Sequence, residues 1–246
     1  MEKKTWMKTA LAPLAFAAAA GMLGATPAMA APSPDYATVA ASQLSQEDEA
    51  AIREHLELYG VTGADADSVV AKAATGETLD ADTGVAPVST DNVQVEGLDY
   101  TVDRFADGSF IALNIAPPAS DADANSRAAL GQGISGCDEL TSVGTQPFVN
   151  CKVSYSGSLF SADFNANFTL STTTAASIQR VWNENANVVA GTFGQEPSVS
   201  ITQQTAGASP AEARLFFTYG STAGVAGSTG SVRLIVSGDS ASVASP

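Results

Sequence analysis

The feature that most constrains this fold is the alternation of apolar and polar residues in the segment 161–170, SADFNANFTL. Side chains of a β-strand point to opposite faces in turn, so this segment predicts a strand with one buried face and one polar face. The apolar positions are Phe164, Ala166, Phe168 and Leu170, and the polar positions between them are Asn165, Asn167 and Thr169.

Four further segments repeat this period, and clusters of Gly, Ser, Asn and Pro separate them. Strands at such spacing are typical of antiparallel sandwiches, and an up-and-down barrel is the alternative. We therefore expect a mainly β protein in which residues 134–246 form an antiparallel β-sandwich. The four segments are CKVSYSGSL from 151, SVSITQQT from 198, ARLFFTYG from 213 and SVRLIVSG from 231.

A small, acidic α+β region is predicted before the sandwich, at residues 44–115, and it opens with two short helices. Ser45 can cap the first helix, which has three acidic residues in its first turn, and Gly60 is placed to end it. The second helix is expected from about Asp65 to Ala74, with Gly76 as its stop.

A three-stranded meander should follow the helices, because turn signals divide the segment 93–115 into β-rich runs. These two-residue signals are Glu96-Gly97 and Asp107-Gly108. Residues 116–133 then combine small residues with prolines and show no apolar spacing, which is typical of a linker. The chain is thus expected to form two domains, 44–115 and 134–246.

Residues 1–30 have the pattern of a secretory signal peptide. They combine a basic start, an apolar run and the small-residue site Ala28-Met29-Ala30. We expect cleavage near Ala30, a disordered stretch at 31–43, and a secreted protein with no membrane span in its mature form. An uncleaved membrane anchor is the alternative.

The charge of the chain is strongly negative and unevenly placed. It is −15 at pH 7, and removing the predicted signal, which holds three lysines and one glutamate, makes it −17. Such an excess repels nucleic acid, so we expect no nucleic-acid partner. Residues 31–130 hold 18 acidic and 4 basic residues, whereas residues 131–246 hold 7 and 4. This asymmetry indicates two differently built regions.

Cys137 and Cys151 are the two cysteines of the chain, 14 positions apart. Two cysteines in a secreted chain most often pair, and closing such a loop contributes about 3 kcal/mol. A zinc site would need two more ligands, and a redox pair would favour C-x-x-C spacing. We therefore predict a structural disulfide, with free thiols or a metal clip as the alternatives.

Motifs for catalysis or metal binding are missing from the sequence. His55, the one histidine, lies near the edge of the apolar stripe of the first helix, and no nucleophile motif accompanies it. Three D-x-D pairs begin at Asp65, Asp80 and Asp121, but the middle one fails the calcium-loop template because Val85 stands where glycine is required. We assign no catalytic residue, no metal and no cofactor.

Acidic residues of the β region offer the one remaining route to catalysis. A glycoside hydrolase needs two carboxylates that converge on one bond, and no sequence pattern pairs any two of these residues. A carboxylate-based hydrolase of unrecognised type is therefore kept as an alternative. The seven residues are Asp138, Glu139, Asp163, Glu184, Glu196, Glu212 and Asp239.

Trp182 is the one tryptophan after the predicted signal, and Asn183, Glu184 and Asn185 follow it. An aromatic ring beside amide and carboxylate groups can stack on a sugar and hydrogen-bond its hydroxyls. These four residues are our candidate ligand contacts. The alternative is that Trp182 belongs to the core of the sandwich.

Two stretches resemble a group of uncharacterised secreted proteins from actinobacteria that have a cysteine-paired β domain. They are PVSTDNVQVEGLDYTVDRFADGSF, from residue 87, and GCDEL…VNCKVSY, from residue 136, taken together with SPAEARLFFTYG. The resemblance implies secretion, the disulfide and a β-rich C-terminal domain, and it brings no known activity.

These patterns together favour a secreted, non-catalytic binding or interaction protein of the extracellular space or cell envelope. The expected partner is an envelope glycan or protein. A secreted hydrolase is the first alternative. The second is that residues 44–115 act as a pro-region or regulatory module for the β domain.

Overall fold

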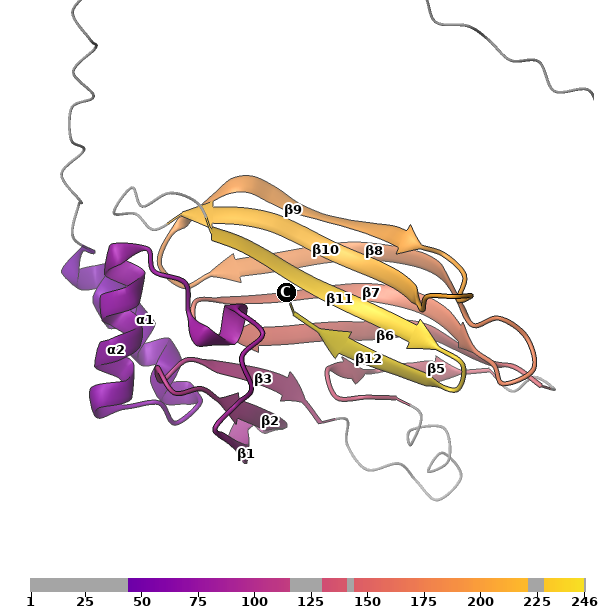
Figure 1. The fold of residues 1–246 in the computed structure, drawn as a ribbon, viewed down its shortest axis with the longest axis horizontal. Coiled ribbons are helices and arrows are strands. Elements are labelled where there is room, and N and C mark those ends of the chain that lie inside the picture. The colour runs from indigo at the N-terminus through magenta and orange to yellow at the C-terminus, as the bar shows by residue number, and fades with distance from the viewer. Residues whose placement is uncertain (1–43, 116–129, 141–143, 221–227, 246) are drawn as a thin grey trace, which may run out of the picture. The chain divides into compact units, whose positions relative to one another are not determined.

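The structure, a computed structural model, describes residues 44–115, 130–140, 144–220 and 228–245 (Figure 1). The predicted signal peptide at 1–30 and the predicted disordered stretch at 31–43 lie outside the described residues, as does most of the predicted linker. Neither α1 nor α2, the α-helices of the described part, has the length and apolar character needed to cross a bilayer.

The described elements comprise two α-helices, a single turn of 3₁₀ helix and twelve strands. The helical elements are α1 (Gln46–Leu58), α2 (Gly63–Thr75) and η1 (Asp80–Asp82). The strands are β1 (Ser89–Val95), β2 (Leu98–Arg104), β3 (Phe110–Asn114), β4 (Ile134–Ser135), β5 (Asp138–Glu139), β6 (Gln146–Gly157), β7 (Phe160–Leu170), β8 (Ser177–Val188), β9 (Thr192–Gln203), β10 (Ala211–Gly220), β11 (Ser228–Ser237) and β12 (Ser240–Ala244).

The strands form two antiparallel sheets that face each other. We call them sheet A and sheet B, and sheet B lies in front in Figure 1. Sheet A has the order β1-β2-β3-β6-β7-β8, and the short strands β4 and β5 also pair with β6. Sheet B has the order β12-β11-β10-β9. The predicted mainly β fold with an antiparallel sandwich is confirmed. The described strands form two separate sheets and not the up-and-down barrel that was the alternative.

The core of the sandwich lies between the two sheets and is rich in aromatic side chains. Every second residue of β7 and of β10 is buried, as the alternation in their sequences predicts. Phe168 stacks on Phe148 of β6, and Phe160 meets Phe217 of β10 edge to face, so aromatic contacts join strands within a sheet and across the two sheets.

Both predicted helices are present, and their ends show why the sequence places them there. The Ser45 hydroxyl accepts a hydrogen bond from the backbone N–H of Asp48, and Val61 N–H donates to Leu56 C=O around Gly60, which has φ +75°. Helix α2 begins at Gly63, two residues before the predicted start, and ends at Thr75, where Gly76 caps it in a left-handed conformation.

The predicted meander is also confirmed, with one difference in its second turn. Glu96 and Gly97 form a two-residue turn, both with positive φ, between β1 and β2. The connection from β2 to β3 spans five residues, 105–109, because Phe105 N–H bonds to Ser109 C=O. Gly108 sits there at φ +83°, and a side chain on it would collide with the backbone of Asp65.

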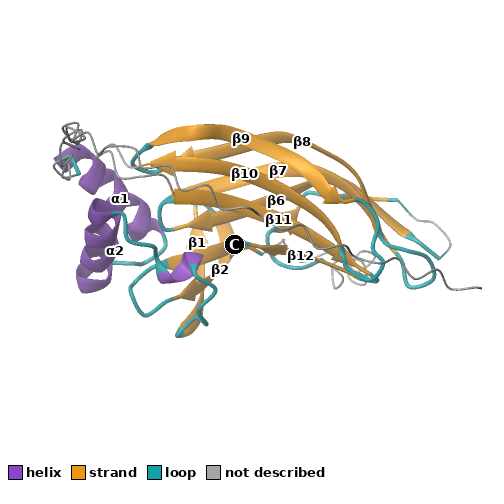
Figure 2. Cartoon of the chain, turned by 45° about the horizontal axis from the view of Figure 1, so that its top comes forward, coloured by secondary structure: helices purple, strands orange, loops and turns teal. Residues whose placement is uncertain are grey.

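Strand β3 connects the helix and meander region to the sandwich, because its two faces belong to two hydrophobic clusters. Phe110 and Ala112 are buried in a cluster with α1 and α2, whereas Ile111 and Leu113 pack against the sandwich core. Ile111 also pairs with Gly157 of β6, so sheet A runs without a break through both regions. Figure 2 shows the two helices at one end of the strands, beside β1 and β2.

The described end of the predicted linker is held by hydrogen bonds. Gly131 N–H donates to Ala241 C=O, Gly133 N–H donates to Asn114 C=O, and Ser154 N–H donates to Gly133 C=O. These bonds tie residues 131–133 to β3, β6 and β12. The division into two domains at 116–133 stays a prediction.

The predicted disulfide is confirmed between Cys137 and Cys151. It joins the entry of the sandwich to β6, where the side chain of Cys151 is fully buried. The intervening residues return as a short antiparallel pairing of β5 with β6, in which Asp138 lies opposite Val149. Asn150, at φ +57°, forms a bulge beside it and binds the Asp138 carboxylate through its side-chain amide.

Candidate functional site

The outer face of sheet A is a continuous polar surface centred on β7. The outward residues of β7 all carry hydrogen-bonding groups, and those of β6 and β8 flank them in register. All are exposed or half-buried. We call this set the sheet A face: Ser161, Asp163, Asn165, Asn167 and Thr169 of β7, Lys152, Ser154 and Ser156 of β6, and Arg180, Trp182, Asn185 and Asn187 of β8.

A β-bulge places two of the predicted ligand residues on this face. Trp182 lies opposite Asn165 and Asn185 lies opposite Asp163, so three steps along β8 match two steps along β7. Without the extra residue, positions three apart would point to opposite faces of the sheet. Asn183, at φ +55°, and Glu184 are both exposed at the bulge.

Charged and amide groups of the sheet A face contact one another across the strands. The carboxylate of Asp163 accepts a hydrogen bond from Asn185 Nδ2 at 3.3 Å and lies 3.5 Å from Lys152 Nζ. The guanidinium of Arg180 stacks 4.8 Å from the centre of the Trp182 ring. The ring of Trp182 is half-buried on the outer surface and is not part of the core that lies between the sheets.

His55 has a structural contact that the sequence did not predict. Its Nε2 lies 2.9 Å from the carbonyl oxygen of Gly157 at the end of β6, and its ring contacts Tyr59 and Phe110. Burial lowers the pKa of His55, and the hydrogen bond to Gly157 offsets part of that effect. The His55 side chain therefore connects α1 to the end of β6.

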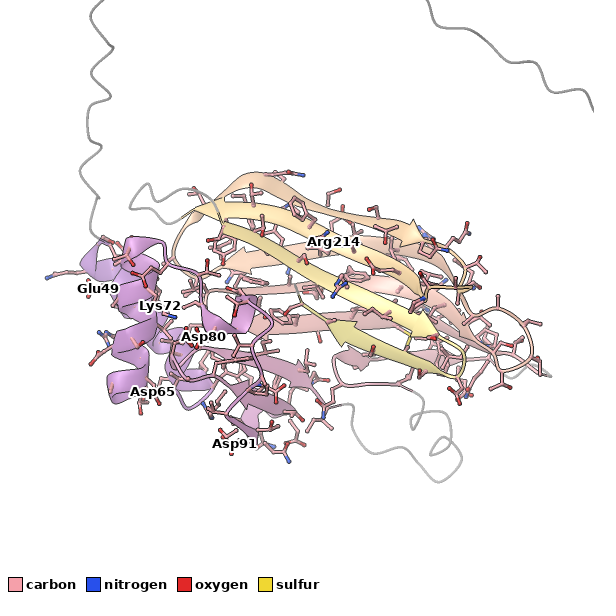
Figure 3. All side chains as sticks on the ribbon, viewed as in Figure 1. Glu49, Asp65, Lys72, Asp80, Asp91 and Arg214 are labelled. Atoms are coloured by element: carbon pink, nitrogen blue, oxygen red, sulfur yellow. A yellow bond between two sulfur atoms is a disulfide. The ribbon has the colours of Figure 1, made fainter. Side chains whose placement is uncertain are left out.

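Acidic residues of two D-x-D pairs take part in the packing of the helices. Asp67 bonds to Arg53 at 2.7 Å, and Asp80 bonds to Lys72 at 3.2 Å. Figure 3 labels Lys72 and Asp80, which lie near each other. The pair that begins at Asp121 lies outside the described residues. In the described ranges, no three His, Cys, Asp or Glu side chains are placed to hold a metal ion.

Asp107 is the most densely bonded carboxylate of the described chain. Its side chain is 6% exposed, and it accepts hydrogen bonds from Lys72 Nζ, from the backbone of Asp80, and from the backbone and hydroxyl of Ser109. Burial raises the pKa of Asp107, but the hydrogen bonds outweigh it and hold the pKa below its ordinary value. This carboxylate joins α2, η1 and the β2–β3 loop.

Asp82 has the opposite environment to Asp107. Burial, with a smaller contribution from the charge of Asp107, raises the pKa of Asp82 from 3.8 to about 6. Its charge also acts on Tyr155 and Tyr219 at this end of the sandwich, where burial is the main cause of their raised pKa values. Asp82 is thus a half-buried acid that forms no ion pair with any Lys or Arg of the described ranges.

A shallow depression at the other end of sheet A brings two of the seven candidate carboxylates together. Glu139 of β5 and Asp239 of the β11–β12 turn both line it, and its volume is about 320 Å³. Glu139 also accepts a hydrogen bond from Gln146 Nε2 at 2.7 Å. The sequence could not pair these two acids because 100 positions separate them.

Comparison with known proteins gives no family. No family model matches the chain, and no curated protein matches it. Among solved structures, one similar chain is a hypothetical protein from Listeria monocytogenes EGD-e, at 15% identity and a TM-score of 0.34. That similarity covers 69% of this chain and all of the other, and it carries no argument about function.

Proposed function

We propose that this chain is a secreted, non-catalytic binding protein of the extracellular space or cell envelope, and that the sheet A face holds a glycan. Secretion is supported by the disulfide, since such bonds persist in oxidising compartments. The resemblance to secreted actinobacterial proteins is part of the same proposal. The predicted site residues Trp182 and Asn185, with Asn183 and Glu184 at the bulge beside them, supply the contacts.

One observation carries this proposal: an aromatic ring lies in register with a row of amide and carboxylate groups on an open sheet. Sugar rings present C–H faces that stack on aromatic rings, and hydroxyls that hydrogen-bond to amides and carboxylates. Trp182 provides the ring, and Asn165, Asp163 and Asn185 lie directly beside it on the same face. The bulge in β8 is what brings the ring and Asn185 to the same side.

Glycan binding is tested on an array of neutral oligomers of glucose, mannose, galactose and N-acetylglucosamine. We expect the wild-type chain to be retained on at least one of them, and Trp182→Ala to weaken that binding about tenfold through lost stacking. Trp182→Phe should restore most of it. Phe216→Ala, which removes a surface ring from the opposite sheet, is the matched control and should bind as the wild type does.

Two results would overturn the glycan proposal. One is the absence of retention on every oligomer, and the other is equal loss of binding in Trp182→Ala and Phe216→Ala. If a protein partner from the cell envelope is retained instead, the binding function stands and its ligand class changes.

A hydrolase is the second candidate, favoured by the depression that Glu139 and Asp239 share. Glycoside hydrolysis needs two carboxylates on either side of one bond, and Glu139 and Asp239 both line this depression. The test is release of nitrophenol from nitrophenyl glycosides by the wild-type chain and by Glu139→Gln. Activity that the variant abolishes supports the hydrolase, and equal rates in the two proteins exclude these carboxylates.

A further inference from the structure

Four residues form a compact block on the outer face of sheet B, opposite to the sheet A face. Arg214 of β10 lies directly across from Arg233 of β11, and Phe216 lies directly across from Ser231. The residues that alternate with them along both strands point into the core. Figure 3 labels Arg214 on β10, near the middle of the sheet that faces the viewer.

Two positive charges therefore stand side by side in a strongly acidic chain. Like charges directly opposite each other on neighbouring strands repel and destabilise a sheet. Among the described residues, Glu212 is the one carboxylate that forms an ion pair with either arginine. It lies 3.7 Å from Arg233 Nη1 and also accepts a hydrogen bond from Thr202. Arg214 has no ion pair with any described residue, and its guanidinium stacks 5.1 Å from the centre of the Phe216 ring.

Three hydrogen-bonding atoms of the block are buried without a partner among the described residues. They are the Nε atoms of Arg214 and Arg233 and the hydroxyl of Ser231, a residue that is 1% exposed. A buried donor without a partner costs free energy, so native structures rarely keep one. Arginine nitrogens donate and never accept, so the missing partner must be an acceptor.

We propose that this block is an anion site, and that an oxyanion (a carboxylate, phosphate or sulfate group) lies between Arg214 and Arg233. An oxyanion removes the repulsion between the guanidinium groups. It accepts from the planar fork of Arg214 and from Arg233, whose Nη2 also donates to the Ser245 carbonyl, and the Ser231 hydroxyl is a third donor. Rotation of the two arginine side chains about the anion gives their Nε–H groups a partner. Ser200 and Ser198 of β9, opposite Arg214 and Phe216, are exposed at the rim and add hydroxyl donors.

The site is tested by NMR titration of the arginine Nε–H resonances with sodium sulfate, at an ionic strength kept constant with sodium chloride. We expect the resonances of Arg214 and Arg233 to shift along one saturable curve. Arg214→Gln should weaken sulfate binding about tenfold or more, and Arg214→Lys, which keeps the charge but loses the fork, should weaken it less. Circular dichroism checks that both variants fold.

Two control variants separate this site from the rest of the molecule. Arg53→Gln removes an exposed arginine that already pairs with Asp67, and Trp182→Ala alters the sheet A face. Both should bind sulfate as the wild type does. Because Trp182→Ala removes glycan contacts and not these donors, failure of one site is distinguishable from failure of the other.

A second titration identifies the source of the anion. If the acidic group belongs to a polymer, polygalacturonate should bind at least about tenfold more tightly per carboxylate than acetate does, since many groups on one chain raise the effective concentration. If the source is a free ion, sulfate or phosphate should bind more tightly than the polymer. Shifts that stay linear in sulfate, or that are equal in wild type and Arg214→Gln, would overturn the anion site.

Discussion

The helix and meander region and the sandwich use their charged residues in different ways. Every described Lys and Arg of residues 44–115 pairs with a carboxylate: Arg53 with Asp67, Lys72 with Asp80 and Asp107, and Arg104 with Asp91. In the described sandwich, Arg180 and Arg214 have no ion pair and stack on Trp182 and Phe216 instead.

This difference separates charges that hold the fold from charges that are available to a ligand. The helices are short and pack on β1–β3 through a small hydrophobic cluster. Ion pairs and hydrogen bonds from the loops therefore add to the stability of this region. The sandwich has a larger apolar core and a disulfide, so its outer faces can be polar without supporting the fold. Its two arginine–aromatic pairs lie on those faces, one on each sheet.

Removing Asp107 should give the largest loss of stability among the charged residues. Asp107→Ala deletes a buried acceptor and leaves its donors unpaired, which costs about 3 to 5 kcal/mol of unfolding free energy. Asp163→Ala, the matched change on the sheet A face, removes a more exposed carboxylate and should cost about 1 kcal/mol or less. Urea unfolding of both variants measures the two losses of unfolding free energy. Equal losses would contradict the proposed difference between the two regions.

Opening the disulfide should have the next largest effect. Closure of a loop of this length stabilises a fold by about 3 kcal/mol, so reduction should lower the urea midpoint of the sandwich. The double variant Cys137→Ala/Cys151→Ala is the control, and its midpoint should not respond to reductant. If reductant also left the urea midpoint of the wild type unchanged, the apolar core would stabilise this end of β6 without help from the disulfide.

Asp82 should give a smaller effect that depends on pH. Its folded pKa of about 6 lies above the ordinary 3.8, so the stability it contributes is fully present below pH 3.8 and is lost as pH rises through 6. The difference between these two pKa values corresponds to at most about 3 kcal/mol of unfolding free energy. Asp82→Asn cannot ionise and should therefore be more stable than the wild type at pH 8.

The pH dependence itself is the control for Asp82→Asn. At pH 4 the two proteins should have nearly equal unfolding free energies, because Asp82 is then protonated in the folded wild type. Comparing the proteins at the same pH cancels the contribution of His55, whose lowered pKa acts in the opposite direction. If Asp82→Asn raised the unfolding free energy by the same amount at pH 4 and pH 8, burial of the Asp82 charge would not be the cause of the added stability.

Much of the fold followed from local patterns in the sequence. Strands β7, β10 and β11 were predictable because their apolar and polar faces separate strictly, and α1 because Ser45 and Gly60 mark its ends. Strand β8 was not predicted, since two bulges interrupt its alternation. Strand β12 has only five residues, too few for a period to stand out.

The candidate sites could be predicted only in part, because most of their contacts depend on strand register. The sequence singled out Trp182 by its rarity, but Asn165 and Asp163 become its neighbours only when β7 pairs with β8. Arg214 and Arg233 likewise meet through the pairing of β10 with β11. No local signal connects residues that lie 17 to 19 positions apart in separate strands.

The most direct test of a ligand face on the sandwich is NMR mapping of the neutral oligomer that the array retains best. We predict shifts concentrated on the Trp182 indole N–H and on the side-chain amides of Asn165 and Asn185, with residues 46–114 unaffected. Shifts confined to the helices and meander would contradict the account, as would shifts confined to the depression beside Glu139 and Asp239.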